Sequence, residues 1–181
     1  MRYKQLHDLI KLLNPKSICE IGTWNGQNAI NMLHSCDADL YIGYDLFEEA
    51  TAETDAVEFN VKAHNAVDTV RNRIKEAHGS VSVNLVKGNT RETLKNVRAD
   101  FVFLDGGHSI ETIESDYNAV KGSGVIVFDD YYVADEEGRC PDIYKVGCNK
   151  LLSNIPHIVF GDKDPVSGGG YTRLAMVICN G

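Results

Sequence analysis

The chain has 181 residues and a mass of 20.0 kDa, which is enough for one well-buried domain and short for two. Ordinary proportions of hydrophobic (43%) and charged (24%) residues exclude a disordered or collagen-like protein. The formal charge is −8, from 18 basic and 26 acidic side chains, and it argues against nucleic acid or an anionic membrane as a partner.

No stretch of the sequence approaches the roughly 20 apolar residues of a membrane helix. Residues 1–8 lack the apolar core of a signal peptide, and the five scattered cysteines are typical of a reduced, intracellular protein. We therefore expect a cytoplasmic location. We also expect a single domain over residues 1–181, with an N-terminal helix in 1–15 and a core in 16–181.

Apolar periodicity predicts helices that alternate with short strands. The expected strands are Ser17–Ile21, Leu40–Tyr44, Val81–Val86, Phe101–Leu104, Gly124–Phe128, His157–Phe160 and Leu174–Cys179. The expected helices are one ending at Pro15, one following Gly26, a long one striped from Val57 through Val61 to Ala77, Thr90–Val97, one capped by Ser109, and Ile143–Leu152.

Strands separated by helices predict a doubly wound α/β fold, in which a mostly parallel sheet of seven strands carries helices on both faces. The last two expected strands have no helix between them. They are therefore predicted to form an antiparallel hairpin at one edge of the sheet.

Polar and glycine residues follow five of these strands. They are Glu20–Gly26 after the first strand, Asp45 after the second, Gly88–Thr90 after the third, Asp105–His108 after the fourth, and Asp129–Asp130 after the fifth. Ligands of open α/β sheets bind at the carboxyl ends of the strands, so we expect these five ends to surround one crevice.

The first of these loops lets a ligand approach the backbone at Gly22 and the start of a helix at Gly26. Trp24 and Asn25 stand where the dinucleotide fingerprint G-x-G-x-x-G needs glycine, so an NAD(P) oxidoreductase is disfavoured. Glu20 suits a cationic ligand better than a pyrophosphate. Both glycines can alternatively serve turn geometry alone.

The next two strand ends fit the remaining parts of an adenosyl ligand. Asp45 can accept two hydrogen bonds from ribose hydroxyls, and Asn89 or Thr90 can meet an adenine edge. An adenosyl group that carries an amino acid and a sulfonium satisfies these side chains better than a dinucleotide does.

The pattern Glu20-x-Gly22-x-x-x-Gly26, followed by Asp45, Phe103–Ser109 and Val127–Tyr131, resembles the class I S-adenosylmethionine-dependent methyltransferases. The resemblance runs from Ser17 to Cys179, and the Phe103–Ser109 run followed by Tyr117 is similar to the macrocin-type sugar O-methyltransferases. It implies a Rossmann-like sheet and S-adenosylmethionine as cofactor. The residues predicted to bind this cofactor are Glu20, Gly22, Thr23, Trp24, Gly26, Asp45, Asn89, Thr90 and Asp105. Trp24 departs from the family, where many members carry glycine at this position. Its side chain can either shape the cofactor pocket by stacking or narrow it.

Asp105, Asp129 and Asp130 follow adjacent strands, and three carboxylates suit Mg²⁺ or Ca²⁺. The resemblance implies that they are ligands of Mg²⁺ or another divalent cation. His108, three residues after Asp105, is a candidate catalytic base beside it, because an imidazole can take up a proton near neutral pH. The catechol-type enzymes have a lysine at the same offset. Each of these residues also has a plain alternative. Asp105 and His108 can close a turn, and Asp129 with Asp130 can cap a loop.

The sequence therefore predicts methyl transfer to the hydroxyl oxygen of a small acceptor, with a sugar implied by the resemblance alone. A metal-independent N- or C-methyltransferase and a non-catalytic adenosyl-binding module are the alternatives. Because the chain has little sequence beyond the core, a homo-oligomer that completes the acceptor pocket is also an expectation.

Overall fold

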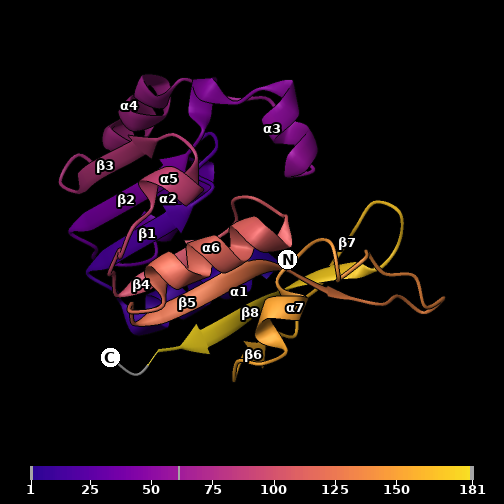
Figure 1. Ribbon diagram of the computed structural model, residues 1–181. Helices are drawn as coiled ribbons and strands as arrows, with labels where there is room; N and C mark the ends of the chain where they lie inside the picture. The colour runs from indigo at the N-terminus through magenta and orange to yellow at the C-terminus, as the bar shows by residue number, and fades with distance from the viewer. Residues whose placement is uncertain (1, 61, 180–181) are drawn as a thin grey trace.

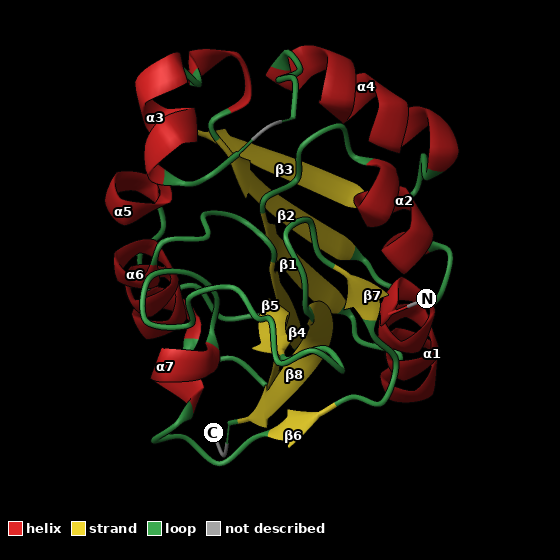
Figure 2. Cartoon of the chain, turned by 90° about the vertical axis from the view of Figure 1, so that its right-hand side faces the viewer, coloured by secondary structure: helices red, strands yellow, loops and turns green. Residues whose placement is uncertain are grey.

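The computed structural model describes residues 2–60 and 62–179, and its centre is an eight-stranded sheet between two layers of helices (Figures 1 and 2). The strands are β1 (Ser17–Ile21), β2 (Leu40–Asp45), β3 (Ser82–Lys87), β4 (Phe101–Leu104), β5 (Val125–Val133), β6 (Ile158–Val159), β7 (Asp164–Pro165) and β8 (Tyr171–Ile178). Their order is β3-β2-β1-β4-β5-β8-β6, and β7 pairs with β8.

Strands β1 to β5 run parallel, whereas β8 runs antiparallel to β5, β6 and β7. The predicted Rossmann-like α/β fold and its antiparallel C-terminal edge are confirmed. The short strand β7 makes the sheet eight-stranded. It lies in the connection before β8, where no strand was predicted.

Helices α1 (Arg2–Leu13), α2 (Gln27–Leu33) and α4 (Val67–Ala77) cover one face of the sheet (Figure 2). Helices α5 (Thr90–Thr93), α6 (Ile110–Val120) and α7 (Asn149–Leu152) cover the other, while a 3₁₀ turn (Phe47–Glu49) and α3 (Ala52–Val57) follow β2. Alternating side chains of β1 and β4 enter separate apolar clusters, one on each face. Across the part of the chain that is described, no helix is long and apolar enough to cross a membrane.

Three of the predicted helices are broken or shortened, and residues with positive φ mark two of the breaks. The expected helix Thr90–Val97 ends at Thr93, because Leu94 has an extended backbone with ψ 108°. The long helix expected from Val57 to Ala77 is α3 and α4 with a loop between them, since Phe59 has φ 55° and ends α3. Val61 of its predicted stripe lies outside the described residues. Helix α7 keeps only the last four residues of the expected Ile143–Leu152, because Gly147 has φ 80°.

The fold positions a crevice outside the carboxyl ends of β1 and β4. The chain steps outward from β1 through β2 to β3 and then returns to β4 on the other side of β1, which is the switch point of the sheet. Here the turn after β1 meets the turn after β4. A Cβ on Gly22, whose φ is 93°, would collide with the carbonyl oxygen of Asp105, so only glycine fits there.

Candidate active site

A cavity of about 340 Å³ lies at this switch point, within the size range of small-ligand sites. Seven of the predicted site residues line it: Gly22, Trp24, Asp45, Asn89, Thr90, Asp105 and His108. The crevice expected from the strand ends is therefore present, and it brings together residues from the ends of β1, β2, β3 and β4.

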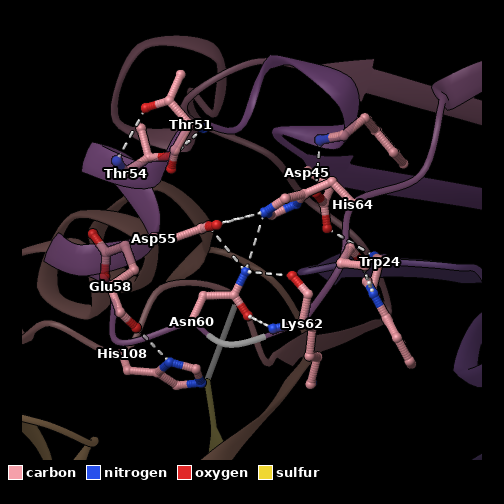
Figure 3. Close-up of polar contacts among 12 residues, drawn as sticks. Trp24, Asp45, Thr51, Thr54, Asp55, Glu58, Asn60, Lys62, His64 and His108 are labelled. Carbon is pink, nitrogen blue, oxygen red and sulfur yellow. Dashed lines mark hydrogen bonds and ion pairs between the residues drawn. The ribbon is translucent and has the colours of Figure 1, made fainter.

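One part of the cavity is lined by a covering segment, defined as residues 51–66 without residue 61, which is not described. Figure 3 shows polar contacts of several of its residues. The Trp24 indole donates its Nε1 hydrogen to the carbonyl oxygen of Ala63 at 2.7 Å. Asp55 joins the two ends of the segment, because its Oδ1 lies 2.9 Å from Nε2 of His64 and accepts Nδ2 of Asn60 at 3.1 Å. The segment is thus held against the strand ends by specific polar contacts.

The carboxylate of Asp45 is held rigidly at the end of β2. Its Oδ2 accepts the backbone N–H of Trp24 at 2.7 Å and its Oδ1 accepts that of Phe47 at 2.8 Å. Each oxygen keeps a second lone pair, so the side chain can still accept hydrogen bonds from a ligand in the cavity. Trp24 is 38% exposed, and the Lys62 ammonium lies 5.2 Å from the centre of its ring.

Three residues predicted to bind the cofactor do not line the cavity: Glu20, Thr23 and Gly26. The Glu20 carboxylate is buried beneath α2, where it accepts hydrogen bonds from the Tyr41 hydroxyl and from Nδ2 of Asn28 at 2.8 Å. The alternation of side chains along β1 turns Glu20 toward α2, away from the crevice. The missing side chain of Gly26 instead leaves room for α4, whose side chains a Cβ there would touch.

Burial raises the pKa of Glu20 from 4.5 to about 7, so folding favours its neutral form. The contribution of Glu20 to stability should then be full below pH 4.5 and fall by about 3 kcal/mol as pH rises to about 7, because one pKa unit corresponds to about 1.4 kcal/mol. Replacing Glu20 by glutamine should remove most of this fall. Urea denaturation of both proteins at several pH values measures it, and parallel pH profiles would contradict the assignment.

Arg2 and Tyr3, at the start of α1, contact acidic residues just after β4 and within β5. Arg2 donates Nε and Nη2 to the two carboxylate oxygens of Asp129, at 2.7 and 2.8 Å, and Nη1 to Asp164 at 2.9 Å. The Tyr3 hydroxyl lies 2.9 Å from Asp129 and 3.0 Å from Asp105. Arg2 lowers the pKa of Asp129 against the effect of burial. This carboxylate is therefore already balanced by a cation of the chain.

The predicted set of three aspartate ligands is thus divided between two partners. Strand β5 was expected to end at Phe128, but it continues to Val133 through a β-bulge between Phe128 and Tyr131. Asp129 contacts α1, whereas Asp130 contacts the start of α6, with its Oδ2 3.1 Å from Nε2 of His108.

Within the described chain, the group with metal-ligand geometry is Asp105, His108 and Asp130, whose ligand atoms lie within 4.8 Å of one another. Burial and the neighbouring carboxylates raise the pKa of Asp105 and of Asp130. His108 donates its Nδ1 hydrogen to the carbonyl oxygen of Glu58 at 2.7 Å, so Nε2 is the nitrogen left for a proton or a ligand.

The cavity is acidic. Its lining includes the carboxylates of Asp45, Glu53, Asp55, Glu58 and Asp105, against the two permanently charged side chains of Lys62 and Arg91. Such a lining favours a ligand that carries positive charge. Another buried acid, Asp116 of α6, accepts a hydrogen bond from Thr90 and so holds a lining residue in place.

Sequence reasoning missed Arg2, Tyr3 and Glu58. Arg2 and Tyr3 lie more than 100 residues from their partners, and no motif marks them. Glu58 has a weak signal, because the second glycine of Asp105-Gly106-Gly107 leaves the space that its carboxylate occupies. Such a signal can be read only once the partner is known.

Comparison with known proteins agrees with this geometry. The sequence model of a family described as a methyltransferase domain matches residues 19–131, which is more than half of the chain. A comparison with curated protein sequences gave no significant match.

Three solved structures show the same fold. The O-methyltransferase TomG of Streptomyces achromogenes, involved in tomaymycin synthesis and solved with S-adenosylmethionine, is 16% identical, with a TM-score of 0.60 over 98% of this chain and 79% of its own. An O-methyltransferase of Bacillus cereus with S-adenosylhomocysteine is 18% identical (TM-score 0.62; 98% and 80% covered). The methyltransferase domain of bacterial CtHen1 is 8% identical (TM-score 0.59; 98% and 97% covered). The chain belongs to the methyltransferase-domain family and has the fold of the class I S-adenosylmethionine-dependent methyltransferases.

Proposed function

We propose that this protein transfers the methyl group of S-adenosylmethionine to the hydroxyl oxygen of a small acceptor. The observation that carries the proposal is the acidic cavity at the switch point. In this cavity Asp45 can accept hydrogen bonds from ribose hydroxyls, and His108 can accept a proton. The O-methyltransferases with the same fold support it, two of which were solved with the cofactor or its product.

The lining fits the cofactor, because a sulfonium and an amino group are cationic and the cavity has more carboxylates than cations. Bound there, S-adenosylmethionine supplies an electrophilic methyl group. Asp45 can hold the ribose hydroxyls with its free lone pairs, and Asn89 and Thr90, which also line the cavity, are the proposed contacts of the adenine. Side chains of the covering segment line the same cavity. These residues bind and orient the reactants, which is the main contribution to an in-line displacement.

His108 is the proposed base. The Nδ1 hydrogen is donated to the Glu58 carbonyl, so Nε2 is the nitrogen that would take the proton of an acceptor hydroxyl. The Oδ2 of Asp130 lies 3.1 Å from Nε2, where its carboxylate would pair with a protonated imidazole.

A divalent cation is a second candidate for the same place, favoured by the clustering of Asp105, His108 and Asp130. Two carboxylates and one imidazole suit Mn²⁺ or Zn²⁺ as well as Mg²⁺, and a bound cation would lower the pKa of an acceptor hydroxyl. Arg2 already balances Asp129, so the set differs from the three aspartates expected. A sugar-like acceptor rests on the resemblance of the Phe103–Ser109 run alone.

Calorimetric titration with S-adenosylhomocysteine, and with NAD as the comparison, tests the cofactor. We expect micromolar binding of the adenosyl ligand, about −8 kcal/mol, and none of NAD. Replacing Asp45 by alanine should weaken the binding of S-adenosylhomocysteine at least about tenfold.

Repeating the titration with Mn²⁺ and Mg²⁺, on the wild type and on Asp130→Asn, tests the cation. Absence of adenosyl binding would overturn the proposed function.

Radiolabelled methyl transfer to a panel of sugars, phenols and amines then tests the acceptor. Labelled product from hydroxyl compounds alone is the expected result. Labelled amines would instead indicate an N-methyltransferase.

A further inference from the structure

Glu58, at the end of α3, has no predicted role, yet it makes polar contacts with His108, Ser109 and Thr112. Its carboxylate accepts the backbone N–H of Ser109 at 2.9 Å, the Ser109 hydroxyl at 3.1 Å and the Thr112 hydroxyl at 2.6 Å. Its own carbonyl oxygen accepts Nδ1 of His108 at 2.7 Å (Figure 3). One residue of the covering segment is thus bonded to the first turn of α6 and to the proposed base.

The start of α6 is shaped to receive this carboxylate. Ser109 caps the helix, and a free backbone N–H there attracts an anion. Gly107 completes the site, because a Cβ at this position would lie 2.5 Å from Oε2 of Glu58 and 2.6 Å from Thr112. Any side chain at residue 107 would therefore displace the carboxylate.

The contact with His108 determines which nitrogen of the imidazole carries the hydrogen. A carbonyl oxygen can only accept, so Nδ1 carries a hydrogen. Oδ2 of Asp130 lies 3.1 Å from Nε2, and a neutral imidazole accepts a hydrogen bond there from the protonated carboxyl group. The tautomer and the ring orientation of a catalytic histidine depend on such a partner. Here the partner is a backbone carbonyl, and the carboxylate of the same residue holds that carbonyl in place.

We propose that Glu58 is the positioning residue of His108: its carboxylate fastens the covering segment to the start of α6, and its carbonyl selects the Nδ1-protonated tautomer. This inference rests on the proposed function for its catalytic meaning. The structural part of it, the coupling of the Glu58 side chain to the His108 tautomer, can be measured without a methyl acceptor.

Long-range ¹H–¹⁵N spectra of the labelled protein, at about pH 8, report the tautomer of each histidine, and His108→Gln identifies the signals. Wild type should show one neutral tautomer with hydrogen on Nδ1. In Glu58→Ala and Gly107→Ala, His108 should show exchange between both tautomers, and kcat should fall about tenfold or more while S-adenosylhomocysteine binding changes less.

Glu58→Gln distinguishes positioning from charge. Glutamine keeps an acceptor oxygen for Ser109, and the hydroxyls of Ser109 and Thr112 can turn to accept its amide hydrogens. We therefore expect a wild-type tautomer in Glu58→Gln. The matched control is Glu111→Gln, which removes an exposed acid from the same first turn of α6. It should leave the spectrum unchanged.

The outcomes separate this inference from the proposed function. An unchanged His108 tautomer in folded Glu58→Ala and Gly107→Ala overturns the inference, even if wild type binds S-adenosylhomocysteine. Loss of the tautomer in Glu58→Gln as well would show that charge, and not position, is responsible. Failure of wild type to bind S-adenosylhomocysteine overturns the proposed function and leaves the tautomer result to be judged on its own.

Discussion

Replacing His108 by glutamine is expected to lower kcat by about 10²- to 10⁴-fold, the usual contribution of a general base. The affinity for S-adenosylhomocysteine should change only a few-fold, because the proposed role concerns the acceptor's proton. Glutamine can still donate to the Glu58 carbonyl, so the covering segment keeps its contact. Steady-state kinetics with an acceptor found in the panel, together with calorimetry, measures both quantities.

His34→Gln is the matched control. His34 is exposed at the end of α2, where it packs against His78 and not against the cavity. It should retain wild-type kcat. A fall in kcat of less than about threefold in His108→Gln would contradict the base assignment and favour a reaction driven by binding alone. Equal loss of cofactor binding and kcat would indicate a structural role for His108.

Replacing Arg2 by glutamine is expected to destabilise the protein by about 3–5 kcal/mol, the typical effect of removing one partner of a buried ion pair. The side chain of Asp129 is 2% exposed and that of Arg2 is 16% exposed, so water screens the pair poorly. Without Arg2 the ionised carboxylate loses both hydrogen bonds of its guanidinium partner. Urea denaturation at neutral pH measures the change.

The pH dependence of this defect has a definite sign. In wild type the pKa of Asp129 is lowered, so this group stabilises the protein at pH values above the ordinary carboxyl pKa. That contribution is lost as the pH falls through the lowered pKa. In Arg2→Gln, burial without a cation should raise that pKa, so the defect should shrink as the pH falls toward 5.

The control is Lys4→Gln, which removes a cation from the same helix. Lys4 and Asp8 form an exposed pair, and its loss should cost less than about 1 kcal/mol. A similarly small loss of stability in Arg2→Gln would contradict a stabilising role for the buried Arg2–Asp129 ion pair.

Local sequence signals predicted the core strands well and the connecting helices less well. Apolar runs such as Phe101–Leu104 are buried on both faces of the sheet. Such a run predicts a central strand whichever strands lie beside it. The long helix from Val57 to Ala77 failed, because apolar spacing continued across a loop that polar contacts of Asp55 and His64 hold in shape. Periodicity does not register such contacts.

The sequence by itself determined the alternation of strands and helices, the crevice at the strand ends, and the positions of Gly22, Trp24, Asp45, Asn89, Thr90, Asp105 and His108 around it. These follow from local rules, since the carboxyl ends of parallel strands share one edge of a sheet.

Only the tertiary structure decided which way individual side chains face. It turned Glu20 away from the cavity, separated Asp129 from Asp130 at a bulge, and brought Arg2 to the acidic strand ends. It also placed Glu58 against His108. These contacts join residues far apart in the chain, and their geometry depends on packing between elements, which no local pattern of residue types contains.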